Sequence, residues 1–230
     1  MDSISAIIVA AGKGNRIGTE LPKQFLKLLS KPILYYTLEK FSSNPKIDQI
    51  ILVVAREYLD SPELEEAIPS SINNKSFQIV AGGVTRQDSV KNGLDSISDK
   101  NGIVLVHDGV RPFVTDQIIN ENIIECREAG AVLTAFPVTD TLKKVDGNYV
   151  LNTIDRSNIW KAQTPQTFRF DILEKAFNKA DNQGLEATDE AGLVEGLHKV
   201  RLVKGHQNNF KITHKEDLTL ARALIKEIKR

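Results

Sequence analysis

Short apolar runs alternate along the first part of the chain with longer segments whose apolar positions recur at helical spacing. The runs are continuous and rich in β-branched residues, so they predict buried strands at residues 6–10, 50–55, 77–80, 103–106 and 131–138. We expect helices in the intervening segments, at a stretch that begins near Pro32 and at residues 87–97 and 115–129. Strands that alternate with helices predict an α/β fold, with a mainly parallel sheet and helices on both faces.

The pattern changes after residue 138, where β alternation surrounds Asp146 and Gly147. An Asp-Gly pair is a strong signal for a two-residue hairpin turn, so residues 139–158 are expected to form a β-hairpin arm that projects from the core. Nearer the end, Thr213 and Glu216 have the spacing of a capping box that opens a final helix. Since no linker interrupts the chain, we expect a single domain over residues 1–230.

A glycine-rich turn follows the first predicted strand and contains Gly12, Gly14 and Gly18. Such a turn presents backbone N–H groups at the carboxyl edge of the sheet, where open α/β folds bind ligands. It lacks the terminal Gly-Lys-Ser/Thr of a P-loop, and its third glycine comes one place too late for the dinucleotide fingerprint. Arg16 and Lys23 accompany the loop, and fixed cations stabilise charge that develops on a nucleotide α-phosphate. The loop therefore predicts a nucleotide phosphate site.

Composition narrows the possible functions. The 230 residues include 30 Lys and Arg and 30 Asp and Glu, and this balance argues against nucleic acid as a partner. The only cysteine, Cys126, permits neither an internal disulfide nor a thiolate zinc site. The first apolar run is too short for a signal peptide or a membrane span, so we expect a cytoplasmic protein without membrane contact.

Four other polar residues are expected to have structural roles. Four histidines are too scattered along the sequence for a metal set, and His107, at a strand end, is expected to orient its neighbours. Thr188 is the expected N-cap of a helix whose first turn holds Asp189 and Glu190, where acidic side chains compensate the helix dipole.

Six motifs occur in the order found in the cytidylyltransferases that make CDP-methylerythritol and CDP-ribitol, and together they span nearly the whole chain. They are AAGKGNRIG…LPKQF, AGGVTRQDSVKNGL, VHDGVRPFV, DRSNIWKAQTPQTF, ATDEAGLVE and NFKIT. The chain thus resembles this family, and the resemblance implies a Rossmann-like nucleotidyltransferase fold.

The resemblance also implies a reaction, in which a cytidylyl group passes from CTP to 2-C-methyl-D-erythritol 4-phosphate for isoprenoid biosynthesis by the non-mevalonate pathway. The products are CDP-methylerythritol and pyrophosphate. Mg²⁺ is expected to bind mainly through the CTP phosphates, without a metal site built from protein side chains. The alternative is a ribitol-5-phosphate cytidylyltransferase that makes CDP-ribitol for wall polymers. The sequences DRSNIW and TDEA look more like the methylerythritol branch.

Family roles carried over to this sequence fall into three groups. The residues implied to be catalytic are Arg16, Lys23 and Lys211. Those implied to bind CTP are Ala10, Ala11, Gly12, Gly14, Gly82, Ser89 and Asp108, with Gly82 and Ser89 reading the cytosine edge. Those implied to bind the acceptor are Asp108, Arg111, Thr141, Arg156 and Lys211.

The arm resembles the family's dimerisation arm and implies a homodimer, in which Thr141 and Arg156 reach into the partner's site. Asp155 is expected to orient the guanidinium of Arg156. Since the acceptor already carries an ionised phosphate, the reaction requires no general base.

Overall fold

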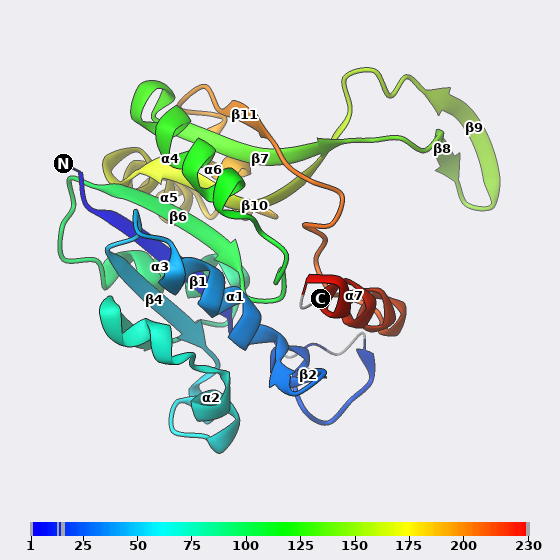
Figure 1. Ribbon diagram of the computed structural model, residues 1–230. Helices are drawn as coiled ribbons and strands as arrows, with labels where there is room; N and C mark the ends of the chain where they lie inside the picture. Colours follow the sequence, from blue (N-terminus) through cyan, green and yellow to red (C-terminus); the bar gives the residue numbers. More distant parts are fainter. Residues whose placement is uncertain (1, 13, 15–16, 229–230) are drawn as a thin grey trace.

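The computed structural model describes residues 2–12, 14 and 17–228, and within them seven strands form one twisted sheet (Figure 1). The strands stand in the order β11-β7-β10-β6-β1-β4-β5. Their bounds are β1 (Ile4–Ala10), β4 (Gln49–Val54), β5 (Ser76–Ala81), β6 (Ile103–Asp108), β7 (Ala131–Pro137), β10 (Trp160–Arg169) and β11 (Arg201–Lys204). Within this sheet the strand pairs are parallel except those of β10, which runs antiparallel between β6 and β7. The predicted mainly parallel sheet is therefore confirmed.

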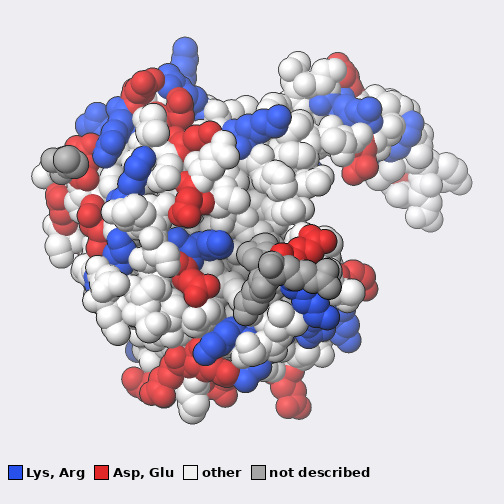
Figure 2. All heavy atoms as spheres, in the orientation of Figure 1, with Lys and Arg blue, Asp and Glu red and all other residues white. Residues whose placement is uncertain are grey.

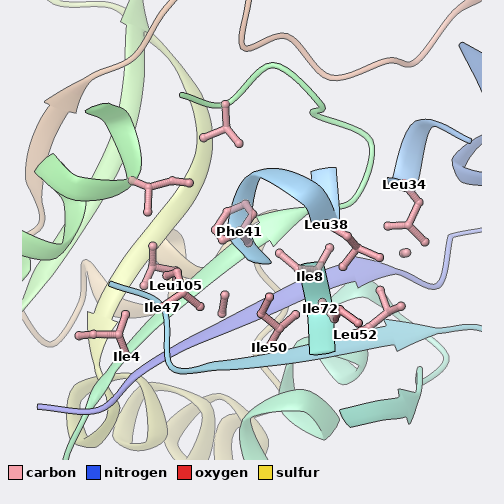
Figure 3. Packing of buried hydrophobic residues seen from close by; sticks show 14 of the residues in the cluster. Ile4, Ile8, Leu34, Leu38, Phe41, Ile47, Ile50, Leu52, Ile72 and Leu105 are labelled. Atoms are coloured by element: carbon pink, nitrogen blue, oxygen red, sulfur yellow. The ribbon is translucent and has the colours of Figure 1, made fainter. Parts of the chain in front are cut away.

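Helices cover both faces of this sheet, because neighbouring residues of a strand point to opposite sides. On one face, Ile8 of β1 packs with α1 (Ile33–Ser43), α2 (Pro62–Ala67) and α4 (Asp116–Ala129). On the other, Ile7 packs with α3 (Arg86–Asp95), α5 (Phe170–Gln183) and α6 (Glu190–Val194). Figure 3 shows the first of these layers, where Leu38 and Phe41 of α1 lie against Ile8, Ile50 and Leu52. The remaining elements are two short strands, β2 (Lys27–Leu28) and β3 (Lys31–Pro32), and three 3-10 helices, η2 (Lys23–Phe25), η3 (Arg56–Tyr58) and η4 (Ser70–Asn74).

Strand β10 was not predicted from the sequence. Its interior is polar, with Gln166 and Thr167 buried, and Pro165 interrupts it. Proline cannot donate to a strand ladder, and the pairing of β10 with β7 shifts register between Ala162 and Gln166, across the proline. Buried polar groups replace the apolar pattern by which strands are recognised.

The final helix is α7 (Lys215–Ile228). Its residues Leu218, Ala221 and Ile225 pack in a separate apolar cluster that also contains Ile17 of the glycine loop. The predicted capping box is wrong in its residues. The hydroxyl of Thr213 donates to the carbonyl of Lys211, and the Asp217 carboxylate accepts the N–H groups of Thr213 and His214 at 2.7 and 2.8 Å. Asp217 takes the part expected of Glu216 because α7 begins at Lys215, one residue after the start that an N-cap at Thr213 implies.

The predicted hairpin forms a small separate sheet of β8 (Leu142–Asp146) and β9 (Tyr149–Ile154), which projects from the body (Figure 1). Its turn lies one residue later than expected, since Asp146 pairs with Tyr149 and the loop is Gly147–Asn148. Gly147 has a φ of 53°, a backbone conformation that glycine adopts without strain. Within the described part of the chain, no helix is long and apolar enough to cross a membrane.

Candidate active site

A pocket of about 780 Å³ opens at the carboxyl edge of β1, β4, β5 and β6. The segments that follow these strands supply most of its lining, as expected for an open α/β sheet. Nine of the residues selected from the sequence line it: Ala10, Ala11, Gly12, Gly14, Lys23, Gly82, Ser89, Asp108 and Lys211. Arg16, the remaining loop residue in the prediction, lies outside the described residues.

The start of the glycine loop is fixed by a side chain that sequence reasoning missed. Gln24 is buried, and its amide nitrogen donates to the carbonyls of Ala10 at 2.7 Å and Gly12 at 3.1 Å. Gln24 belongs to the same short 3-10 turn as Lys23, which is also buried and lines the pocket. The 3-10 turn therefore holds Lys23 close to the glycine loop. In the sequence, the only sign of this role of Gln24 was its position next to Lys23.

Gly82 lines the pocket and is packed against Ala11 and Ser89. A Cβ placed on Gly82 would lie 2.4 Å from the Cβ of Ala11 and 3.0 Å from Oγ of Ser89, so no side chain fits here. The Ser89 hydroxyl donates to the carbonyl of Thr85 at 2.8 Å and accepts the N–H of Gly83 at 3.1 Å. A hydroxyl oxygen has two lone pairs, so Ser89 keeps one acceptor position for a ligand.

Asp108 is the centre of a charged cluster in the pocket wall. Its Oδ1 lies 3.3 Å from Nε of Arg86, and its Oδ2 lies 3.1 Å from both Nε of Arg111 and Nζ of Lys211. Burial alone would raise the pKa of Asp108, but the charges of Arg86, Lys211 and Arg111 outweigh it and hold that pKa far below its usual range. The carboxylate is thus ionised and fixed in orientation.

Arg86 connects Asp108 to a second buried carboxylate, that of Glu190. Nη1 and Nη2 of Arg86 donate to the two Glu190 oxygens at 2.7 and 3.1 Å. Burial raises the pKa of Glu190, while Arg86 opposes the shift. The predicted N-cap Thr188 is wrong, because Asp189 caps α6 and accepts the N–H of Gly192. Arg86 and Glu190 lie in quoted motifs, but their sequence separation hid their pairing.

Arg111 lies behind Asp108 and does not line the pocket. Its side chain donates to Asp108 and, through Nη1, to the carbonyl of Asn209 at 2.9 Å. Buried His107 contacts the hydroxyl of Thr164 at 3.0 Å and the carbonyl of Arg111 at 3.1 Å. Burial lowers the pKa of His107 to about 4, so this imidazole is neutral and holds the Asp108 loop, consistent with the orienting role expected of it.

Thr141 and Arg156 lie on the arm and do not line the pocket. Nη1 of Arg156 approaches the hydroxyl of Thr141 at 3.4 Å, and both residues are exposed. Asp155 does not orient Arg156 as predicted, because its carboxylate accepts the N–H and hydroxyl of Ser157 instead. Figure 2 shows the arm standing clear of the body. Of the residues predicted to bind the acceptor, one chain therefore brings Asp108 and Lys211 to the pocket, but not Arg111, Thr141 or Arg156.

Comparison with known proteins places this geometry in a family. A family model described as 2-C-methyl-D-erythritol 4-phosphate cytidylyltransferase matches residues 4–227. A relative with that name from Alkaliphilus oremlandii is 43% identical over 228 residues, which cover 96% of this chain and 94% of that protein. Another, from Clostridioides difficile, is 41% identical over 227 residues and covers 98% and 95%.

Solved structures agree with these relatives. The crystal structure of 4-diphosphocytidyl-2C-methyl-D-erythritol synthase from Anaerococcus prevotii matches with a TM-score of 0.84 and 32% identity, over 98% of this chain and 99% of that one. The 2-C-methyl-D-erythritol 4-phosphate cytidylyltransferase from Thermus thermophilus matches with a TM-score of 0.81 and 32% identity, over 98% and 100% of the chains.

Proposed function

The chain belongs to the family of 2-C-methyl-D-erythritol 4-phosphate cytidylyltransferases, and we propose that the pocket at the carboxyl edge of β1, β4, β5 and β6 is where it binds CTP. The chain transfers the cytidylyl group of CTP to 2-C-methyl-D-erythritol 4-phosphate, giving CDP-methylerythritol and pyrophosphate for isoprenoid biosynthesis. One observation carries the assignment of the pocket: the glycine loop, Gly82 with Ser89, and the cations Lys23 and Lys211 line a single cavity.

The backbone at Gly82 and the hydroxyl of Ser89 are suited to the base. Both line the pocket, and the remaining lone pair of Ser89 is proposed to accept a hydrogen from the exocyclic amine of cytosine. Uracil has a carbonyl at that position, which cannot donate to Ser89. This contact therefore favours CTP over UTP.

The transfer is an in-line displacement at the α-phosphorus. An oxygen of the acceptor phosphate attacks, the bond to the bridging oxygen of the β-phosphate breaks, and pyrophosphate leaves with that electron pair. Negative charge on the α-phosphate oxygens grows in the transition state, and Arg16, Lys23 and Lys211 are proposed to stabilise it. Lys23 is held next to the glycine loop by the Gln24 contacts, which suits fixed electrostatic stabilisation.

The acceptor is proposed to bind beside Asp108, whose carboxylate accepts hydrogen bonds from polyol hydroxyls. Arg111 supports Asp108 from behind and adds positive charge near the acceptor phosphate. Thr141 and Arg156 are proposed to come from the arm of a second subunit, because on their own arm they do not line the pocket. A homodimer built on the 139–158 arms then completes each site.

Mg²⁺ is proposed to accompany the triphosphate. Among the described residues, no group of three His, Cys, Asp or Glu side chains is placed to hold a metal ion, and Asp108 is the buried carboxylate of the pocket. We propose that the phosphate oxygens of CTP carry the ion, without a metal site built from protein side chains. When bound, Mg²⁺ neutralises charge on the phosphates. We also propose a cytoplasmic location, the compartment that contains CTP.

A pyrophosphate-release assay tests these proposals. Purified protein is given CTP, UTP or ATP with either 2-C-methyl-D-erythritol 4-phosphate or ribitol 5-phosphate, and Mg²⁺ is added or chelated. We expect release with CTP and the methylerythritol phosphate, little with UTP, and loss of activity on chelation. Equal turnover of UTP would contradict the role of Ser89, and full activity in chelator would contradict that of Mg²⁺.

A further inference from the structure

Helix α6 is short, but two side-chain contacts fix its first turn on strand β10. The Gln166 amide nitrogen donates to Oδ2 of Asp189 at 2.8 Å, and its oxygen accepts the N–H of Ala191 at the same distance. Glu190 lies between these two anchored residues and is 1% exposed. The carboxylate of Glu190 therefore has a fixed position next to Arg86, which lines the pocket.

The contact that Glu190 makes is unusual for a residue outside the pocket. Both of its oxygens accept from Arg86, and Arg86 in turn donates through Nε to Oδ1 of Asp108. A bidentate pair between a guanidinium and a carboxylate fixes the plane of the guanidinium as well as its distance. Glu190 on α6 therefore sets the orientation of Arg86, and Arg86 in turn sets the orientation of Asp108.

The three cations around Asp108 differ in how freely they can leave it. The side chain of Lys211 is 33% exposed, against 11% for Arg111, and both contact Oδ2. If Lys211 turns to a substrate phosphate, Arg111 still holds Oδ2 and Arg86 still holds Oδ1. Asp108 is then held by two arginines, and Arg86 is the one that fixes Oδ1.

We propose that Glu190 is a positioning residue for cytidylyl transfer: it holds Arg86 so that Asp108 keeps its orientation when Lys211 moves to the phosphates. The inference rests on the proposed roles of Asp108 and Lys211. Charge supports it. Asp108 and Glu190 together balance two of the three cations, which leaves about one positive charge for the substrate. Without Glu190, Arg86 has one anionic partner fewer and is drawn toward substrate phosphates.

The test compares kinetics of Glu190→Gln, which has nearly the same shape but no charge, with wild type. We expect kcat/KM for the acceptor to fall about tenfold or more, as for lost hydrogen bonds to a charged group, while KM for CTP changes within about twofold. Glu190→Asp keeps the charge and should recover most of the loss. Equal losses in both variants, or normal kinetics of folded Glu190→Gln, would overturn the proposal.

A matched control separates positioning by Glu190 from the loss of any carboxylate at α6. Glu195→Gln removes a carboxylate from the exposed C-terminal end of the same helix and leaves Arg86 and Glu190 untouched, so its acceptor kinetics should stay near wild type. A loss like that of Glu190→Gln would show that loss of any carboxylate at α6 suffices, and the proposal would fail.

A double-mutant cycle tests the route through Asp108. If Glu190 acts on Asp108, then Glu190→Gln should add little to the loss already caused by Asp108→Asn. Losses that multiply would contradict this route. Asp108→Asn with normal turnover would remove the proposed role of Asp108 itself, and with it this inference. An impaired Asp108→Asn beside a normal Glu190→Gln would remove the inference alone. Circular dichroism and CTP binding confirm that each variant is folded.

Discussion

The pocket and the arm are built on opposite principles. In the pocket, side chains are buried and held by several contacts within the same chain, as Asp108 is by Arg86, Arg111 and Lys211. On the arm, all six residues of β9 are exposed, with Tyr149 80% and Val150 61% accessible. An isolated two-stranded hairpin is marginal in water. Under the proposed assignment, the fold of one chain prearranges the half of the site that lines the pocket, while the other half, Thr141 and Arg156, depends on a second subunit.

The prearranged half should show the largest effect of a single substitution. Removing Lys23 in Lys23→Ala should lower kcat by about 100-fold or more, because a fixed cation at a developing charge contributes mainly to the transition state. KM for CTP should change less. Steady-state kinetics measure both, with Lys27→Ala as the control, since Lys27 pairs with Glu66 on the surface. The same result is expected for Arg16→Ala. Turnover near wild type in a folded variant would remove that residue from the mechanism.

If the two halves come from different subunits, two inactive variants should complement each other. Lys23→Ala mixed with Arg156→Ala forms dimers in which one site has both an intact Lys23 and an intact Arg156. Random exchange makes half the dimers mixed, so the regained activity should reach at most about a quarter of wild type. Activity is measured after subunit exchange, which is itself verified by differently tagged subunits. No regain despite verified exchange would contradict the shared site.

A substitution in the half that comes from the second subunit should change the kinetics of the acceptor alone. Arg156→Ala should raise KM for 2-C-methyl-D-erythritol 4-phosphate about tenfold or more, the range for charge-assisted hydrogen bonds to a phosphate. KM for CTP should be nearly unchanged. Arg201→Ala is a suitable control. Arg201 is an exposed arginine on the edge strand β11, and it pairs with Glu125 and Glu128 of α4. A parallel rise in both KM values would place Arg156 near CTP instead.

The same division explains what the sequence could predict. The parallel strands and the hairpin carry their signals within a few residues, and the structure confirms them, apart from the shifted turn at Gly147. The partners of the pocket's charges are far apart in sequence: Arg86 meets Glu190 across 104 positions. No local pattern reports such a pair, and the polar interior of β10 also concealed a central strand. Long-range polar contacts were therefore the part that required the structure.

Dimer formation through the arm can be tested on one hairpin strand. Val150 and Leu151 are exposed neighbours on β9, so their side chains point to opposite faces of the hairpin. A charge on the face that meets the partner, in Val150→Asp or Leu151→Asp, should give a monomer at micromolar concentration and a several-fold higher acceptor KM. The variant on the other face serves as its control. Light scattering that shows a monomeric wild type would contradict the dimer.

The smallest expected effect concerns the stability of the prearranged half. His107 has a pKa near 4 because it is buried, whereas its ordinary value is 6.5. Between these values the unfolded chain binds the extra proton, so the free energy of unfolding is greatest above the ordinary pKa and falls as the pH is lowered. The slope from this group is about 1.4 kcal/mol per pH unit, or about 3 kcal/mol in total.

Urea unfolding at a series of pH values between about 7 and 4 measures that slope. Asp108, whose pKa is lowered by its cations, contributes its full stabilisation above its ordinary value of 3.8 and loses it only as the pH falls below that value, so the two groups change the stability in different pH windows. His107→Gln has no titrating ring and should flatten the curve, even though it loses stability through the contacts with Thr164 and Arg111. An equal slope in variant and wild type would mean that other groups set the acid sensitivity. A flattened slope would show that the neutral imidazole of His107 stabilises the segment around Asp108. The residues of β9 on the arm are exposed, so no buried group of this kind stabilises that strand.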